Sequence, residues 1–360
     1  MARRIGTADL PLHGGHAPRW LFARMVRLSR ALIQIIIRDF GPEDLLARLA
    51  DPFWFQAFGC VLGFDWHSSG LTTTVCGALK EAVKPLSLEL GFFVCGGKAR
   101  ASRRTPQEIL FWAEKAALPG CFSSLVRASR LAAKVDNTAL QDGYQLYHHT
   151  FFFTRSGQWV VIQQGMNETN RYARRYHWLG ERVESFVLEP HQAIASQRKE
   201  KDVLNLVARK SIPTQLAIVD MASRRPEETL KEMKLVARLI LPQRHGLSEK
   251  DLLPKGLHKV LLKTYTQPPT DFEKLLEVEG LGPKSLRALA LLSELVYNTP
   301  VAREDPARYA FAHGGKDGHP FPVERKIYDQ SIAYLEEILS KAKLSGQEKD
   351  KAFRRLHQLF

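Results

Sequence analysis

Acidic, imidazole and amide side chains gather between residues 136 and 167 of this chain. Carboxylates and histidines can hold a divalent ion, which activates water and neutralises charge on the oxygens of a phosphodiester. The pattern predicts metal-assisted phosphodiester hydrolysis with Mn²⁺ or Mg²⁺ as the inferred cofactor; the alternative is a satisfied polar network that only stabilises the fold. The candidate catalytic residues are Asp136, His148, His149, Gln163 and Asn167, and the candidate metal ligands are Asp136, Asp142 and His149.

A β-hairpin must position these groups. Residues 146–154 and 158–164 alternate as strands do and then become apolar on both faces near the turn. A two-residue loop at 156–157 would place His149 opposite Gln164. Adjacent strand residues point to opposite faces, so the two neighbouring histidines cannot both act on one face. The hairpin is predicted to be covered on both sides, with a polar far end that needs partners or a ligand.

Two basic runs offer contacts for nucleic acid. Residues 171–178, RYARRYHW, alternate cations with flat rings that could stack on unpaired bases. An exposed helix with its rings packed inward is an equal alternative. The second run follows a strand predicted at 88–95 and begins with two glycines, which favours phosphate contact over a solvated loop. The candidate DNA-binding residues in these runs are Lys98, Arg100, Arg103, Arg104, Arg171, Arg174 and Arg175.

Residues 271–297, DFEKLLEVEGLGPKSLRALALLSELVY, read as a helix-hairpin-helix. Thr270 is predicted to cap the first helix, and Pro283 to begin the second. The glycines of Gly-Leu-Gly permit a tight turn whose amides could surround one phosphate oxygen. An ordinary αα-hairpin is the alternative, but the complete pattern favours binding to the DNA backbone without sequence readout. The candidate contacts are Gly280, Gly282, Lys284 and Arg287.

The composition agrees with a polyanionic partner. Lys and Arg total 52 against 38 for Asp and Glu, which gives a net charge of +14 spread along the chain. No apolar run reaches membrane length, and the four cysteines form no CxxC pair. We therefore expect a cytoplasmic protein without membrane contact, in a reducing compartment.

The expected fold class is α+β: an N-terminal mixed α/β domain with a central β-hairpin or sheet, followed by an all-helical domain. The predicted segments are an α+β domain at 1–195, a connector at 196–212, a helical domain at 213–300 and a C-terminal loop with helices at 301–360. Two loops outside the main cluster could also contact phosphate or metal: the loop at 65–70 fits helix capping equally well, and the histidine-glycine loop at 311–320 is better explained as a turn. These secondary candidates are Asp65, His67, His313 and Asp317.

Several long blocks resemble a bacterial and archaeal family catalogued as a domain of unknown function, number 763. They are GTADLPLHGGHAPRWL, DWHSSGLTTT, QDGYQLYHHT, VVIQQGMN, ARRYHWL and FAHGGKDG. The resemblance covers nearly the whole chain and implies a helix-hairpin-helix together with suspected divalent-metal-dependent DNA nuclease activity; it assigns no catalytic residue. A mixed sheet like that of ParB-type nucleases is a looser resemblance, based on Asp65-Trp66-His67 before a helix.

Together these patterns predict a metal-dependent DNA nuclease of repair or recombination, with exonuclease favoured over endonuclease. A non-catalytic DNA-binding or structural protein and an RNA-processing hydrolase are the alternatives, because amides that bind phosphate do not distinguish sugars. The sequence leaves a homodimer open.

Overall fold

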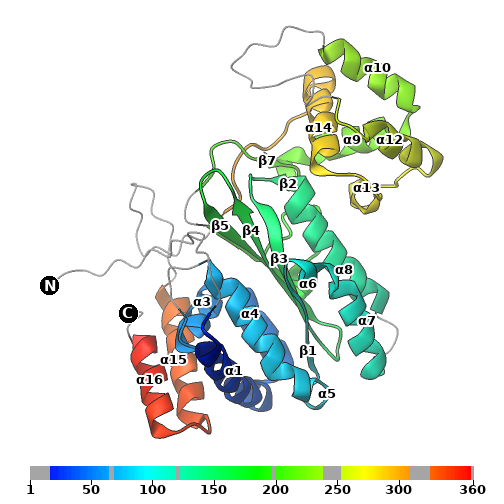
Figure 1. The fold of residues 1–360 in the computed structure, drawn as a ribbon. Coiled ribbons are helices and arrows are strands. Elements are labelled where there is room, and N and C mark those ends of the chain that lie inside the picture. The colour runs from blue at the N-terminus through cyan, green and yellow to red at the C-terminus, as the bar shows by residue number, and fades with distance from the viewer. Residues whose placement is uncertain are drawn as a thin grey trace, which may run out of the picture.

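The computed structural model describes residues 17–64, 69–118, 122–196, 199–237, 253–307 and 325–357. The fold is α+β, as predicted, with a five-stranded sheet in the order β1-β3-β4-β5-β6 (Figure 1). Every pairing in it is antiparallel, so the mixed sheet suggested by the ParB-type likeness is wrong. The strands are β1 (Phe92–Lys98), β2 (Leu140–Gln141), β3 (Gln145–Thr154), β4 (Trp159–Asn167), β5 (Tyr172–Leu179), β6 (Ala193–Ala195) and β7 (Leu204–Asn205).

Helices cover both faces of this sheet. Helices α1 to α4, together with α15 and α16, share one apolar core with it, and α7 and α8 pack on the opposite face (Figure 1). The helices are α1 (Arg19–Phe40), α2 (Pro42–Ala50), α3 (Pro52–Val61), α4 (Gly70–Val83), α5 (Ser87–Leu90), α6 (Arg100–Arg103), α7 (Thr105–Lys115), α8 (Phe122–Lys134), α9 (Ile212–Ser223), α10 (Pro226–Ala237), α12 (Leu257–Thr266), α13 (Phe272–Glu277), α14 (Pro283–Tyr297), α15 (Arg325–Lys341) and α16 (Gly346–His357).

The β3–β4 hairpin is buried on both faces, as predicted, but its register differs by one residue. Phe153 pairs with Trp159 and His149 pairs with Gln163, whereas the two-residue loop had placed His149 opposite Gln164. The Thr154 amide donates to the Gln158 carbonyl at 3.0 Å, so the loop proper is residues 155–157, and Gly157 takes a φ of 83° to close it. Glycine reaches this left-handed region without steric cost, so the longer loop forms here.

The first strand also begins later than predicted. The first residues of the strand expected at 88–95 belong instead to the short helix α5, which is capped by Gly91 with a φ of 61°. Strand β1 then runs from Phe92 through both glycines to Lys98. The basic residues that follow form the short helix α6 instead of a loop.

The segment predicted as a connector contains β7, which pairs with β2 in a small second sheet. The core on the α8 face continues into α9, α10 and α12 to α14, so the helical part and the sheet share buried side chains. The last two helices lie back on the N-terminal core, where α15 packs against α1 and α3 and α16 packs against α3. In the described residues, no helix is both long and apolar enough to cross a membrane.

Candidate nucleic-acid interface and buried polar site

Asp136 lies at the centre of a polar network between α8 and the sheet. A π-helical turn, Val135–Ala139, extends α8 and turns Asp136 inward, where it is fully buried. Its carboxylate accepts hydrogen bonds from Gln163 Nε2 at 2.5 Å, Trp178 Nε1 at 2.9 Å and His191 Nε2 at 2.5 Å. Three donors on one buried carboxylate compensate the loss of water around it.

The contacts of Gln163 fix the donor and acceptor roles in the rest of this network. Gln163 Nε2 also reaches the carbonyl of Ala132 at 3.2 Å, so its amide nitrogen faces two acceptors and its Oε1 must face His149. His149 Nδ1 therefore donates to Gln163 Oε1 at 2.8 Å, and His149 Nε2 accepts from Ser129 Oγ at 2.8 Å. Burial lowers the pKa of His149, which keeps the ring neutral and suits this arrangement.

The predicted metal ligands do not form one site. Both carboxylate oxygens of Asp136 and both ring nitrogens of His149 already have protein partners, and Asp142 belongs to a separate cluster. No group of three His, Cys, Asp or Glu side chains within the described ranges is arranged to hold a metal ion. As these side chains stand, the set Asp136, Asp142 and His149 does not fit a metal ion, so no reaction step through one follows from it.

His148 points to the other face of β3, as strand geometry requires. It is buried, and its Nε2 bonds Thr150 Oγ1 at 2.9 Å. Burial, with smaller effects from the neighbouring His149 and Lys98, lowers the pKa of His148 to about 3. The two histidines that the sequence presented together therefore serve different layers of the fold.

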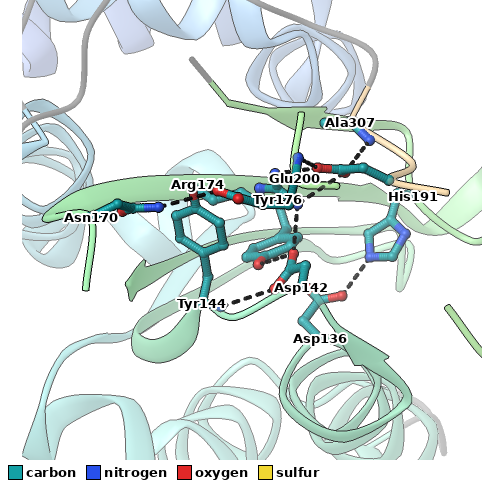
Figure 2. A network of polar contacts seen from close by, with 10 residues as sticks. Asp136, Asp142, Tyr144, Asn170, Arg174, Tyr176, His191, Glu200 and Ala307 are labelled. Carbon is teal, nitrogen blue, oxygen red and sulfur yellow. Dashed lines mark hydrogen bonds and ion pairs between the residues drawn. The ribbon is translucent and has the colours of Figure 1, made fainter. Parts of the chain in front are cut away.

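Asp142 binds Arg174 in a second buried cluster (Figure 2). Arg174 Nη1 donates to Asp142 at 2.9 Å and to Asp305 at 3.0 Å, while its Nη2 donates to Asp305 at 2.6 Å. Burial alone would lower the pKa of Arg174, but the two carboxylates raise it above its ordinary value. Tyr176 donates to the same Asp142 oxygen at 2.8 Å, and the Arg174 guanidinium lies 4.5 Å from the ring centre of Tyr144.

The predicted basic–aromatic surface at 171–178 is a strand in the sheet interior. Strand β5 lies between β4 and β6 in a sheet that is covered on both faces, so Arg174 and Arg175 are fully buried; Arg171, just before the strand, is exposed. Arg175 donates to Gln56 Oε1 at 3.0 Å and to His177 Nε2 at 2.8 Å. Burial lowers the pKa of Arg175 to about 9. Because both guanidiniums are enclosed, Arg174 and Arg175 are withdrawn from the candidate DNA contacts.

The α13–α14 hairpin follows the sequence pattern closely. Asp271, not the predicted Thr270, caps α13 by accepting from the Lys274 amide at 2.8 Å. Gly280 has a φ of 92°, which only glycine adopts readily, whereas Gly282 has an ordinary φ of −117°. A Cβ added at Gly282 would meet no atom within 4 Å, so the space before α14 is open. Lys284 and Arg287 are exposed on α14.

Side chains near the end of α8 hold this hairpin against the sheet part of the molecule. Lys134 Nζ donates to the carbonyl of Leu281 in the hairpin turn. Gln141 donates to the carbonyl of Pro283 at 2.8 Å and accepts from Arg287 Nε at 2.8 Å. The first turn of α14 is therefore fixed beside the polar end of the β3–β4 hairpin.

The basic helix α6 lies at the same end of the sheet. Lys98 pairs with His148, and the first residues of β3 come within reach of the turn that carries Asp136, where Asn137 Oδ1 accepts from the Leu146 amide at 3.4 Å. A cavity of about 520 Å³ lies where the turn before β3, the end of β4 and residues 199–202 meet α14, and its lining includes Asp142, Asn167 and Arg287. The four basic candidates around α6 are all exposed: Lys98, Arg100, Arg103 and Arg104.

Sequence reasoning missed His191. It precedes the short strand β6, bonds the buried Asp136 and lines a second cavity of about 250 Å³. A lone histidine after a proline carries no pattern that would have marked it, since its partner lies 55 positions earlier. The secondary candidates Asp65, His67, His313 and Asp317 lie outside the described residues.

Comparison with known proteins identifies a family without assigning an activity. The family model described as "Protein of unknown function (DUF763)" matches residues 6–323. Searches of curated proteins and of solved structures gave no match.

Proposed function

The chain belongs to the DUF763 family, and we propose that it is a DNA-binding protein that grips the sugar–phosphate backbone with the α13–α14 hairpin. The observation that carries this proposal is the open start of α14. Gly280 makes the turn with a φ of 92°, Leu281 is buried as its anchor, and no atom lies within 4 Å of the position a Cβ at Gly282 would take. A phosphate can approach such a helix start closely and meet its amides.

Charge around the hairpin supports the same conclusion. Lys284 and Arg287 are exposed beside the helix start, and the basic helix α6 adds further cations at this end of the sheet. With a net charge of +14, the chain should attract a polyanion over long range. Contacts of this kind position DNA without reading its bases.

Duplex binding measured over a range of salt concentrations tests this proposal. Replacing Lys284 by Gln should weaken binding and reduce the slope of log K against log salt by about one, as expected for the loss of one phosphate contact. Lys343→Gln is the matched control, because Lys343 is exposed between α15 and α16, away from the hairpin (Figure 1). Equal affinity and equal slope for the two variants would remove the proposal.

Phosphodiester hydrolysis is the second candidate, with Mn²⁺ or Mg²⁺ as the proposed cofactor. The observation that favours it is the cavity of about 520 Å³ that places Asp142 and Asn167 next to Arg287 of the DNA-binding hairpin. Because the predicted ligands are not assembled for a metal, any metal site would have to form with the substrate or with other groups.

End-labelled DNA and RNA should be incubated with Mn²⁺, with Mg²⁺ and with chelator. Cleavage of DNA that the chelator abolishes would support the nuclease, and release of single nucleotides would identify an exonuclease. Cleavage of RNA alone would favour the RNA-processing alternative. Binding of DNA without cleavage under any of these conditions would leave a non-catalytic DNA-binding protein.

A further inference from the structure

The cavity beside His191 is lined by residues 189–194, 205–210 and 302–306. It measures about 250 Å³, which is below the roughly 300–1,000 Å³ of pockets for drug-sized ligands. Arg209 and Lys210 are exposed at its rim, and Glu189 and Glu304 also line it. The lining is therefore mixed, with apolar side chains and charges of both signs, and its volume suits the sugar and phosphate of one nucleotide.

Asp136 determines which nitrogen of the neutral His191 ring carries the hydrogen. The carboxylate of Asp136 is an acceptor for two neutral donors, Gln163 and Trp178. Its 2.5 Å contact with His191 Nε2 is therefore also one in which the carboxylate accepts and the ring nitrogen donates. His191 Nε2 therefore carries the hydrogen, and in the neutral ring Nδ1 is left as an acceptor. Within the described residues no partner of Nδ1 is found.

The ring of His191 is also held in place by apolar contacts. It lies 4.7 Å from the Trp178 ring, edge to face, and 6.0 Å from the ring of Tyr176. The side chain is only 7% exposed. A buried carboxylate with three donors and two aromatic rings thus hold one imidazole at the wall of a polar cavity, which is the construction expected where a fixed acceptor must meet a ligand.

We propose that this cavity binds a single nucleotide unit, with His191 Nδ1 accepting a hydrogen bond from a sugar hydroxyl and with Lys210 and Arg209 contacting the phosphate. Arg209 is 3.5 Å from Glu189, so a phosphate would take over a loose, solvated ion pair. Lys210 has no ion-pair partner within the described part of the chain, which makes it the stronger candidate for the phosphate.

The position of the cavity relative to the hairpin supports a nucleotide as the ligand. Arg287 of the hairpin and Glu200 both line the 520 Å³ cavity. The amide of Glu200 donates to Asp305 at 2.6 Å, and Asp305 lines the cavity of His191. The two cavities thus adjoin the same short segment, so a nucleotide of DNA bound at the hairpin is the ligand class that this neighbourhood favours. To this extent the inference rests on the proposed DNA binding.

The test uses the full-length ¹⁵N-labelled protein and long-range ¹H–¹⁵N spectra of its histidines, with His191 assigned by its loss in His191→Gln. The probes are a 2′-deoxynucleoside 5′-monophosphate, the same nucleoside without phosphate, and inorganic phosphate. The free protein should show His191 hydrogenated on Nε2. The monophosphate should shift the Nδ1 resonance and bind roughly tenfold or more tightly than the nucleoside, as one charge-assisted contact implies.

The variants separate this cavity from the hairpin. Lys210→Gln should weaken binding of the monophosphate about tenfold and leave duplex binding nearly unchanged, whereas Lys284→Gln should do the reverse. Asp136→Asn should allow the hydrogen of the His191 ring to occupy either nitrogen. If that variant does not fold, the spectrum of the unmodified protein alone shows which nitrogen carries the hydrogen. Hydrogen on Nδ1 in the free protein, or no response of His191 to any probe at about 10 mM, would overturn the inference. If only the expected effect of Lys284→Gln on duplex binding were absent, the proposed role of the hairpin would be refuted and the nucleotide site would stand.

Discussion

The two glycines of the hairpin provide the sharpest test, because the structure assigns them different roles. Gly280 has a φ of 92°, so Gly280→Ala should destabilise the protein by about 1–3 kcal/mol through backbone strain. Gly282 has a φ of −117° with open space around it, so Gly282→Ala should be neutral or should stabilise by about 0.4–1 kcal/mol. Urea denaturation measures both changes in the free energy of unfolding.

DNA binding should respond in the opposite sense at Gly282. A methyl group there would occupy the space through which a phosphate approaches α14, so one charge-assisted hydrogen bond worth about 1.5–3 kcal/mol should be lost. That corresponds to roughly a 10- to 100-fold weaker duplex affinity in a fully folded protein. Fluorescence anisotropy with a labelled duplex measures it. A Gly282→Ala protein that binds as tightly as the unmodified chain would show that the turn serves only the fold.

Three further predictions follow from buried charge and packing. Burial lowers the pKa of His148 to about 3, whereas its pKa in the unfolded chain is near 6.5. The full free energy of unfolding is therefore present above pH 6.5, and about 1.4 kcal/mol of it should be lost per pH unit as the pH falls from 6.5 toward 3. Denaturation at pH 7 and pH 5 measures this loss, and equal stabilities would contradict it. Asp305→Ala leaves buried Arg174 with one carboxylate and should cost about 3–5 kcal/mol in the same assay, whereas a loss below about 1 kcal/mol would mean that the pair is solvated. Gln141→Ala removes the bonds to Pro283 and Arg287 and should weaken duplex binding while changing stability by less than about 2 kcal/mol; unchanged binding would show that the hairpin does not need this support.

Local patterns predicted most elements of the fold. The pattern at 271–297 predicted the two helices α13 and α14, and alternation with turn residues predicted the β3–β4 hairpin and its two covered faces. The errors came where a single glycine decided the chain path. Gly157 allowed a three-residue loop and shifted the register, and Gly91 ended a helix inside the segment expected to be a strand.

The polar site could be predicted only in part, because its partners are far apart in sequence. Asp136 and Gln163 were both singled out as candidates, and they do meet, at 2.5 Å; their catalytic role stays a prediction. Arg174 was predicted to be an exposed cation, because its partner Asp305 lies 131 positions later and no local sequence pattern indicates the pair. A buried arginine and a surface arginine look alike in sequence until the carboxylates that neutralise one of them are located.

The buried cluster around Arg174 bears on both proposed binding sites. It joins three segments: Asp142 from the turn before β3, Arg174 from β5, and Asp305 from the chain that leaves α14. Breaking a buried pair of this kind is costly, so the cluster resists movement of the helical part relative to the sheet. The cavity that contains Asp142 borders the hairpin, and the cavity that contains Asp305 borders His191. An arginine that sequence alone assigns to DNA contact is therefore a structural residue, which fixes the distance between the proposed backbone site and the proposed nucleotide site.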